Sequence, residues 1–294
     1  MGALSVWVKA SRPKTLPAAL APVAVGTCLA AGPAGVFKPL VLLATIIGAL
    51  FIQIGTNLSN DYEDARRGAD TEDRLGPVRV TAGGLVPPKY VLYATWVAFA
   101  IAALAGVYLV IEAGWELILI GAASIVAGVL YTGGPRPYGY VGLGEVFVFL
   151  FFGVVAVTGS YFVQTTVFAW EAVAVSIPVG LLACSLLMVN NIRDIDTDRR
   201  AGKKTLAVRL GREKMRTVFS ATILIAFILV PVVWLATGLT AWMNLALLAL
   251  PLYPPLARTV RERTDGAALN KALGESARLE LAFCVLLSIG LLLA

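Results

Sequence analysis

Histidine is absent from this chain of 294 residues, and cysteine is scarce. Without an imidazole the chain has no His-ligated metal or haem site, and proton transfer falls to carboxylates, tyrosine, lysine or water. The three cysteines, Cys28, Cys184 and Cys284, lie in apolar runs without CxxC or Cys/His spacing, which excludes a disulfide framework and a zinc site. The sequence also lacks a P-loop, a GxSxG elbow, an HExxH motif and a dinucleotide fingerprint.

Charge is also scarce. Charged residues make up 14% of the chain and hydrophobic residues 59%, whereas a soluble globular protein carries about 25% charged residues. The mean hydropathy is +0.82. This composition indicates an integral membrane protein.

Nine apolar runs have the length of about 17 to 25 residues that a helix needs to cross the hydrocarbon core. They are residues 15–34, 39–60, 90–111, 115–132, 143–164, 170–192, 215–237, 240–257 and 277–294. The runs are continuous and do not alternate, which favours helices over barrel strands. We predict an all-α transmembrane bundle of about nine helices. We treat residues 1–294 as one domain, with halves at 10–132 and 143–257 and a ninth helix at 277–294. No ionisable residue is expected at mid-depth in the last three helices.

Basic residues give the chain its net charge of +6. All 24 Lys and Arg residues except Lys38 lie in segments that face one side of the predicted membrane. The positive-inside rule therefore predicts a cytoplasmic N-terminus and an outside C-terminus in a cell membrane. This distribution explains the charge without a nucleic-acid partner. The N-terminal segment lacks the pattern of a cleavable signal peptide, so we expect the first helix to be retained.

Two of the apolar runs, the second and the sixth, end in Asn and Asp residues. They continue as NLSNDYEDARRGADTEDR (57–74) and NNIRDIDTDRR (190–200). A shift of 130 residues places Asn60 on Asn190 and Asp64 on Asp194. The two segments therefore form a pair of related motifs.

The acidic and amide side chains of both motifs have helical spacing. One face of a helix would carry Asn57, Asn60, Asp61 and Asp64 in the first motif, and Asn191, Asp194 and Asp198 in the second. Carboxylates three or four residues apart repel one another unless a cation lies between them, and their oxygens suit Mg²⁺. We therefore predict one site for a divalent cation and a multiply charged oxygen ligand. A solvated acidic helix end is the alternative, although Asp at a helix C-terminus opposes the helix dipole.

Several basic and aromatic side chains could accompany this site. Before the first helix, Arg12 or Lys14 either anchors the chain at lipid headgroups or contacts an anion. The Gly- and Pro-rich segment 68–88 is predicted to be a lid that carries Asp70, Asp73, Arg74 and Arg79. In YTGGPRPYGYVGLGE (131–145), Arg136 could hold an anion, whereas each tyrosine could equally be an interfacial residue. After the second motif, Lys203 could neutralise a diphosphate or meet anionic lipid.

At these motifs the sequence resembles the UbiA superfamily of intramembrane aromatic prenyltransferases, whose hallmark is a pair of Asp-rich motifs. Within it, the chain is similar to the group that acts on 1,4-dihydroxy-2-naphthoate in menaquinone synthesis. The similarity is carried by SRPKTLP, NDYEDARRGADTEDR, GPVRVTAGGL, YTGGPRPYGYVGLGE and NNIRDIDTDRRAGKKTLAVRLG, which lie within the first 212 residues. One departure is that the third Asp of the first motif falls six residues after Asp64, so Asp70 or Asp73 takes that position.

The resemblance implies a central cavity open to the cytoplasmic side and a Mg²⁺-dependent reaction. A polyprenyl diphosphate would donate its prenyl group to 1,4-dihydroxy-2-naphthoate, with loss of CO₂ and diphosphate, giving demethylmenaquinone. The implied Mg²⁺ ligands are Asn60, Asp64, Asp70, Asp194 and Asp198, with Asp61 beside them in the catalytic group. The implied substrate-binding residues are Lys14, Arg74, Arg79, Tyr131, Arg136, Asn191 and Lys203. Decarboxylation removes the need for a base at the ring carbon, in agreement with the absence of histidine.

Other functions remain open from the sequence. A related prenyltransferase could use 4-hydroxybenzoate or homogentisate as the acceptor. A membrane transporter with a cation site is a different class, but transporters bring such groups to the bilayer midplane on broken helices. A phospholipid headgroup transferase would carry D-x-x-D-G-x-x-A-R, which this chain lacks.

Overall fold

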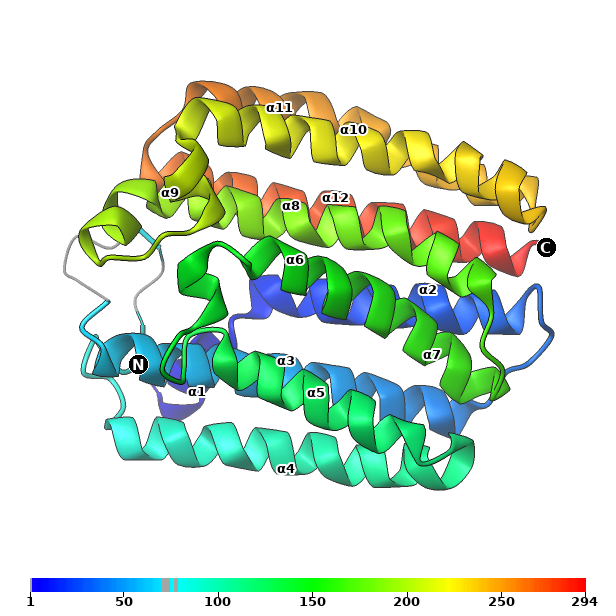
Figure 1. The fold of residues 1–294 in the computed structure, drawn as a ribbon, viewed down its shortest axis with the longest axis horizontal. Coiled ribbons are helices and arrows are strands. Elements are labelled where there is room, and N and C mark those ends of the chain that lie inside the picture. The colour runs from blue at the N-terminus through cyan, green and yellow to red at the C-terminus, as the bar shows by residue number, and fades with distance from the viewer. Residues whose placement is uncertain (1, 70–74, 77–78) are drawn as a thin grey trace.

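The computed structural model of the protein describes residues 2–69, 75–76 and 79–294. Long helices run side by side along the longest axis of the molecule, and the two termini lie at opposite ends of the bundle (Figure 1). The all-α fold is confirmed, and the described residues contain no strand.

Seven long α-helices form most of the bundle. They are α2 (Leu16–Ala31), α3 (Pro39–Arg66), α4 (Pro88–Ala113), α5 (Glu116–Leu130), α8 (Trp170–Arg200), α10 (Arg212–Thr237) and α12 (Gly266–Leu292). Pro39 and Pro88 occupy first helical positions, where the missing amide hydrogen costs nothing.

Two further segments are built from pieces. One consists of α6 (Gly144–Val148), the π-helix η3 (Phe149–Val155) and α7 (Ala156–Thr165). The other is the 3-10 helix η4 (Ala241–Leu252) followed by α11 (Tyr253–Glu262). The remaining elements are short: α1 (Ala3–Ser11), η1 (Pro13–Thr15), η2 (Tyr138–Val141) and α9 (Leu206–Leu210).

Among the described residues, six helical segments are long and apolar enough to cross a membrane. The chain is a multi-pass membrane protein. α5 is apolar but only 15 residues long, and α12 carries several charged residues in its first half. The expected number of nine spans therefore stays a prediction.

Helix ends differ from the predicted ones in three places that matter. α3 continues to Arg66 and α8 to Arg200, so the first motif is helical through Arg66 and the whole of the second motif is helical. α12 begins at Gly266, because Asp265 Oδ1 accepts a hydrogen bond from the Ala268 amide at 2.9 Å and caps the helix. This early start places Glu280 in the middle of α12, where its side chain is buried. The expectation of no ionisable residue at mid-depth in the last helices was therefore wrong.

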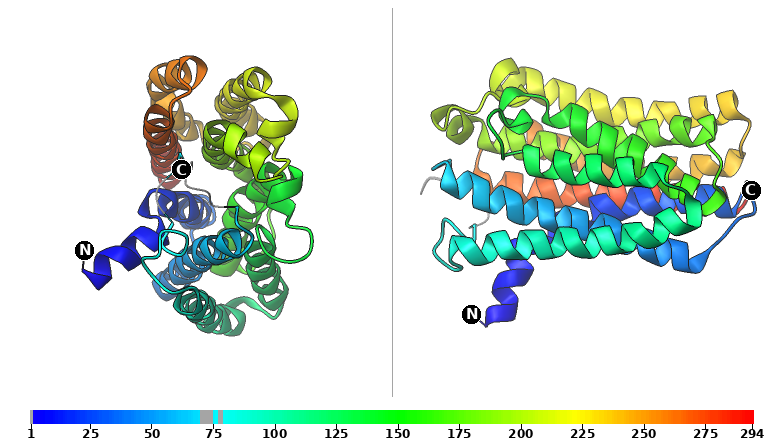
Figure 2. Two further views of the ribbon diagram at one scale, coloured as in Figure 1. Left: turned by 90° about the vertical axis from the view of Figure 1, so that its left-hand side faces the viewer. Right: turned by 60° about the horizontal axis from the view of Figure 1, so that its bottom comes forward.

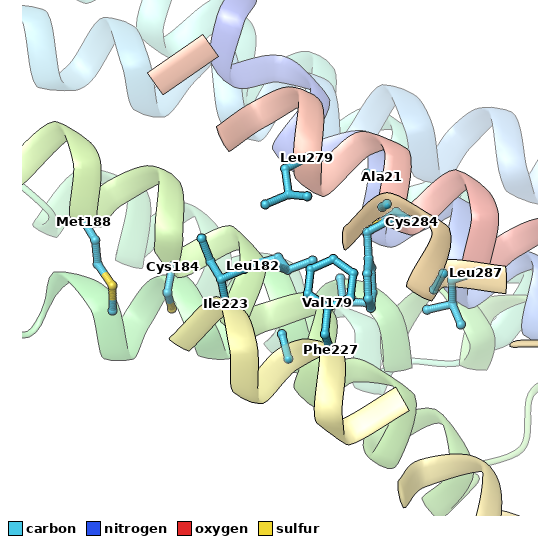
Figure 3. Packing of buried hydrophobic residues seen from close by; sticks show 14 of the residues in the cluster. Ala21, Val179, Leu182, Cys184, Met188, Ile223, Phe227, Leu279, Cys284 and Leu287 are labelled. Atoms are coloured by element: carbon cyan, nitrogen blue, oxygen red, sulfur yellow. The ribbon is translucent and has the colours of Figure 1, made fainter. Parts of the chain in front are cut away.

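The main hydrophobic core lies around α8, which packs against α10, α12 and η3. Figure 3 shows Val179 and Leu182 of α8 beside Ile223 and Phe227 of α10. The ring of Phe227 meets that of Phe283 edge to face at 5.3 Å. Because α8 is buried along most of its length, the second motif at its end has a rigid support.

α1 projects sideways from the bundle (Figure 2). Its residues Val6 and Trp7 pack against Val80 and Val86 from the segment after α3. Arg12 then ends α1 in the left-handed conformation, with φ of 52°, and redirects the chain into η1 and α2. This turn brings the N-terminal segment beside α3.

Candidate active site

A cavity of about 400 Å³ lies within the bundle and is lined by α2 to α8. Its charged end is lined by three carboxylates and three cations of the described chain: Asp64, Asp194, Asp198, Arg12, Arg79 and Lys203. The rest of the lining is mainly apolar, including Ile52, Phe147, Phe151 and Leu186. The cavity therefore combines a charged end with a long apolar interior.

Asp64 lies at the centre of the charged end and is buried. Its Oδ2 accepts a hydrogen bond from Arg79 Nη2 at 3.0 Å. Its Oδ1 accepts from the Tyr140 hydroxyl at 2.6 Å and from Lys203 Nζ at 3.2 Å. Arg79 lies in the segment that follows α3, and Lys203 lies in the segment that follows α8. The Asp64 carboxylate therefore connects the two segments that come after the two motifs in sequence.

The neighbouring residues of the first motif have different surroundings. Asn60 lines the cavity and its Oδ1 accepts a hydrogen bond from the Thr132 hydroxyl at 2.9 Å. Asp61 does not line the cavity: its carboxylate accepts from the amides of Val80 and Thr81 at 3.0 and 2.9 Å. Asp61 therefore holds the segment that presents Arg79, and it does not face the cavity as a catalytic residue would.

The second motif presents Asn191, Asp194 and Asp198 to the same cavity. The Asn191 amide nitrogen donates to Glu145 Oε1 at 2.9 Å, which leaves its carbonyl oxygen as the free acceptor. Asp196, which also belongs to the second motif, is exposed and pairs with Arg212.

Arg193 organises this motif, and the sequence analysis did not select it. Its guanidinium is 1% exposed and donates to both oxygens of Asp194, at 2.8 and 2.5 Å. It also donates to Asn190 Oδ1 at 2.8 Å and to Asn270 Oδ1 at 2.7 Å. The Asn270 amide donates in turn to the Leu75 carbonyl, which ties α12 to the segment after the first motif. The sequence did offer one signal for Arg193, namely a basic residue placed among the amide and carboxylate residues of the motif.

The predicted substrate-binding residues fall into two groups, those that line the cavity and those that do not. Arg79, Tyr131, Asn191 and Lys203 line the cavity. Lys14 and Arg136 are exposed and do not line it. Arg12, two residues before Lys14, does line it. Asp70, Asp73 and Arg74 lie outside the described residues.

Aromatic rings follow the cavity wall from its charged end. Tyr131 meets Tyr138 edge to face at 5.4 Å, Tyr138 stacks on Phe147 at 3.9 Å, and Phe147 is followed by Phe151 at 6.1 Å. Tyr131 lines the cavity at the junction of the charged and apolar parts, where its hydroxyl can donate a hydrogen bond.

The residues at the charged end suit a hard cation. They offer carboxylate and amide oxygens and no nitrogen or sulfur ligand, which is the donor set that Mg²⁺ takes. Among residues 2–69, 75–76 and 79–294, no three carboxylates gather closely enough to hold a metal ion by themselves. The set therefore fits an ion that shares its coordination with substrate phosphate and water.

The profile of the UbiA prenyltransferase family matches residues 19–287. The chain belongs to this family. Family membership makes it a prenyltransferase. It is 42% identical to 1,4-dihydroxy-2-naphthoate octaprenyltransferase of Mycobacterium tuberculosis, over 94% of this chain and 93% of that protein. It is 37% identical to the Escherichia coli protein of the same name, over 98% and 95% of the two chains.

A solved structure has the same UbiA fold. It is a UbiA homolog from Archaeoglobus fulgidus bound to GPP and Mg²⁺, with a TM-score of 0.67 and 16% sequence identity. The alignment covers 96% of this chain and 99% of the other. At this identity the likeness concerns the fold of the family.

Proposed function

We propose that this protein transfers a polyprenyl group from a polyprenyl diphosphate to 1,4-dihydroxy-2-naphthoate. The observation that carries the proposal is the single cavity in which both motifs and two loop cations, Arg79 and Lys203, line one end while apolar side chains line the rest. The relatives named 1,4-dihydroxy-2-naphthoate octaprenyltransferase support the choice of acceptor and a long donor. The resemblance noted from the motifs points to the same acceptor.

The charged end is the binding site for the donor's diphosphate in this proposal. Asp64, Asn60, Asn191, Asp194 and Asp198 would hold Mg²⁺. The ion supplies positive charge that stabilises the leaving diphosphate. Arg79 and Lys203, now paired with Asp64, add fixed positive charge where negative charge builds up as the C–O bond breaks.

The reaction forms one carbon–carbon bond and breaks two bonds. The allylic carbon leaves the diphosphate oxygen and bonds to the ring carbon that carries the carboxylate. That carboxylate leaves as CO₂, and its bonding electrons restore the aromatic ring. The immediate product is the hydroquinone, which yields demethylmenaquinone on oxidation. No base at the ring carbon is required.

The apolar wall protects the reactive allylic carbon. Phe147 and Phe151 lie beyond Tyr131 along the cavity, so water that reaches the charged end meets an aromatic lining before the interior. Excluding water favours attack by the naphthoate over hydrolysis.

The bundle is proposed to lie in the cell membrane with the charged end towards the cytoplasm. Lys203 and the basic residues near it lie at that end, while Lys38 opens α3 at the other. The positive-inside rule favours this orientation, with the N-terminus inside and the C-terminus outside.

Mass analysis of the products tests the proposal. Purified protein would be incubated with octaprenyl diphosphate, Mg²⁺ and one acceptor at a time: 1,4-dihydroxy-2-naphthoate, 4-hydroxybenzoate or homogentisate. We expect a prenylated, decarboxylated naphthalene product that disappears when Mg²⁺ is chelated. Product from another acceptor alone would replace the proposed substrate, and uptake of substrate into vesicles without diphosphate release would favour a transporter.

Variants of the motifs test the site. Asp64→Ala and Asp194→Ala should reduce turnover by roughly a hundredfold or more, because each removes a charge at the reacting phosphate. Asp196→Ala is the matched control, since this exposed residue of the second motif does not line the cavity. Retained activity in either cavity variant would contradict the assigned roles.

A further inference from the structure

We propose that the first turns of α12 position Arg79 through a dock, formed by Gly266 and Asn270, that holds the backbone of Leu75. Neither Gly266 nor Asn270 lines the cavity, so both are positioning residues. This inference rests on the proposed function, since it concerns how the binding of the donor's diphosphate depends on α12. It gives a role in the reaction to a helix that carries neither motif.

Leu75 packs directly against the first residue of α12. A Cβ atom added to Gly266 would lie 2.9 Å from the Leu75 Cβ and 3.2 Å from the Leu75 carbonyl oxygen. One turn further along the helix, the Asn270 side-chain amide donates to the same carbonyl oxygen at 2.8 Å. Because Gly266 has no side chain, the Leu75 backbone can come within hydrogen-bond distance of Asn270.

The start of α12 is itself held in place. Asp265 caps the helix, and the Arg216 guanidinium of α10 donates to the Arg263 carbonyl at 2.6 Å just before it. Asn270 Oδ1 accepts a hydrogen bond from Arg193 Nη1 at 2.7 Å, so the amide nitrogen of Asn270 faces the other way, towards Leu75. The dock is therefore fixed to the rest of the bundle on both sides.

The dock acts on Arg79 through a short length of backbone. Leu75 precedes Arg79 by four residues, which span at most about 14 Å. On the other side, the amides of the two residues that follow Arg79 are held by Asp61. Arg79 thus lies between two anchored points, and its Nη2 donates to Asp64 at 3.0 Å at the charged end.

The position of this guanidinium matters for its proposed role. Arginine binds phosphate through N–H groups whose geometry is fixed, often two at a time. A misplacement of about 1 Å in such a group can cost roughly a hundredfold in rate. Displacing the Leu75 anchor should therefore weaken the interaction of Arg79 with the donor's diphosphate.

Gly266→Ala tests the dock without removing any hydrogen-bonding side chain. Gly274→Ala is the matched control, because a Cβ atom at Gly274 of the same helix would meet no atom within 4 Å. The KM for octaprenyl diphosphate and the KM for 1,4-dihydroxy-2-naphthoate would be measured for each variant. We expect Gly266→Ala to raise the donor KM roughly fivefold and to leave the acceptor KM unchanged. Gly274→Ala should change neither value.

Asn270→Asp tests the hydrogen bond of the dock separately. An aspartate can still accept from Arg193 but cannot donate to the Leu75 carbonyl, so the donor KM should rise as it does in Gly266→Ala. Asn244→Asp is its control, since it also removes a side-chain donor from a backbone carbonyl, that of Ala241 in η4. A donor KM for Asn270→Asp equal to that of the unmodified protein would overturn the inference.

Combination with Arg79→Ala distinguishes positioning from a general loss of structure. The dissociation constant of octaprenyl diphosphate would be measured without an acceptor, so that slow variants can be compared. If the dock acts through Arg79, Gly266→Ala should change this constant less than about twofold once Arg79 is alanine. An undiminished effect in that background, or an equal rise in the acceptor KM, would overturn the inference. Donor binding by the unmodified protein without transfer to any acceptor would instead contradict the proposed function.

Discussion

At the residue scale, two basic residues that are close in sequence near the charged end of the cavity lie in different environments. Arg12 and Lys14 belong to the same basic segment, but only Arg12 lines the cavity. Arg12 has a φ of 52°, which reverses the chain between α1 and η1. Asn57 secures this turn, because its side-chain amide donates to the Ser11 carbonyl at 3.0 Å and to the Thr15 hydroxyl at 3.1 Å. The two cations therefore point to different surroundings.

Alanine substitution should separate these two cations. We expect Arg12→Ala to raise the KM for the polyprenyl diphosphate by roughly tenfold, because a cation at the charged end is lost. Lys14→Ala should leave the KM unchanged, since Lys14 is exposed. Steady-state kinetics with varied donor concentration provides the measurement. An equal effect of both substitutions would show that the charge acts through the membrane surface.

A second prediction concerns Arg193, whose guanidinium donates hydrogen bonds to both carboxylate oxygens of Asp194. Lysine keeps the charge but cannot form the bidentate pair. Arg193→Lys should lower the free energy of unfolding by about 1–3 kcal/mol, since buried acceptors lose their donors. It should also raise the Mg²⁺ concentration that gives half-maximal rate.

The matched control for Arg193→Lys is Arg212→Lys. Arg212 pairs with the exposed Asp196 and also donates a hydrogen bond to the Ile192 carbonyl. Its replacement therefore disturbs fewer buried hydrogen bonds than that of Arg193, which makes four. Thermal unfolding in detergent and Mg²⁺ titration of the rate would compare the two variants. If Arg193→Lys matched the control in both measurements, Arg193 would not be a positioning residue for Asp194.

At the element scale, the π-helix η3 brings its segment into close contact with α8. A Cβ on Gly153 of η3 would lie 2.5 Å from the Cα of Gly180 in α8. The π-helix also changes the direction of the side chains around it, and Phe151, Phe152 and Val155 all line the cavity. The aromatic wall therefore depends on close backbone contact between these two elements.

Gly153→Ala should destabilise the protein by about 1–3 kcal/mol, because the backbones of η3 and α8 must separate to admit the methyl group. Gly159→Ala is a suitable control on the same segment, since its Cβ would enter open space. The melting temperatures of the two variants in detergent provide the comparison. A melting temperature for Gly153→Ala equal to that of the control would show that the contact tolerates expansion.

At the scale of the whole molecule, the two halves of the chain meet through their motifs. Lys203 of the second half binds Asp64 of the first, and the Lys204 amide donates to the Tyr140 carbonyl at 2.7 Å. Neither half completes the charged end alone. We therefore propose that residues 1–294 act as one prenyltransferase unit.

Orientation in the membrane is testable with an impermeant maleimide. Ala34→Cys and Lys204→Cys place exposed thiols at opposite ends of the bundle. If the charged end faces the cytoplasm, Lys204→Cys should react only in inside-out vesicles and Ala34→Cys only in right-side-out vesicles. The reverse pattern would overturn the proposed orientation.

Composition was sufficient to predict the membrane class and the helical fold, because hydrocarbon requires helices with satisfied backbones. Motif spacing was sufficient to predict that Asp64 and Asp194 line the same site. Spacing along a helix also selected Asn60, Asn191 and Asp198, which line the same cavity. The structure alone showed that Asp61 holds the Val80 and Thr81 amides, that Arg12 lines the cavity whereas Lys14 does not, and that Glu280 lies at mid-helix. These features depend on a left-handed turn, on a capping residue and on contacts between distant segments. Local sequence patterns carry no information about which distant segment a side chain will meet, so tertiary packing decided them.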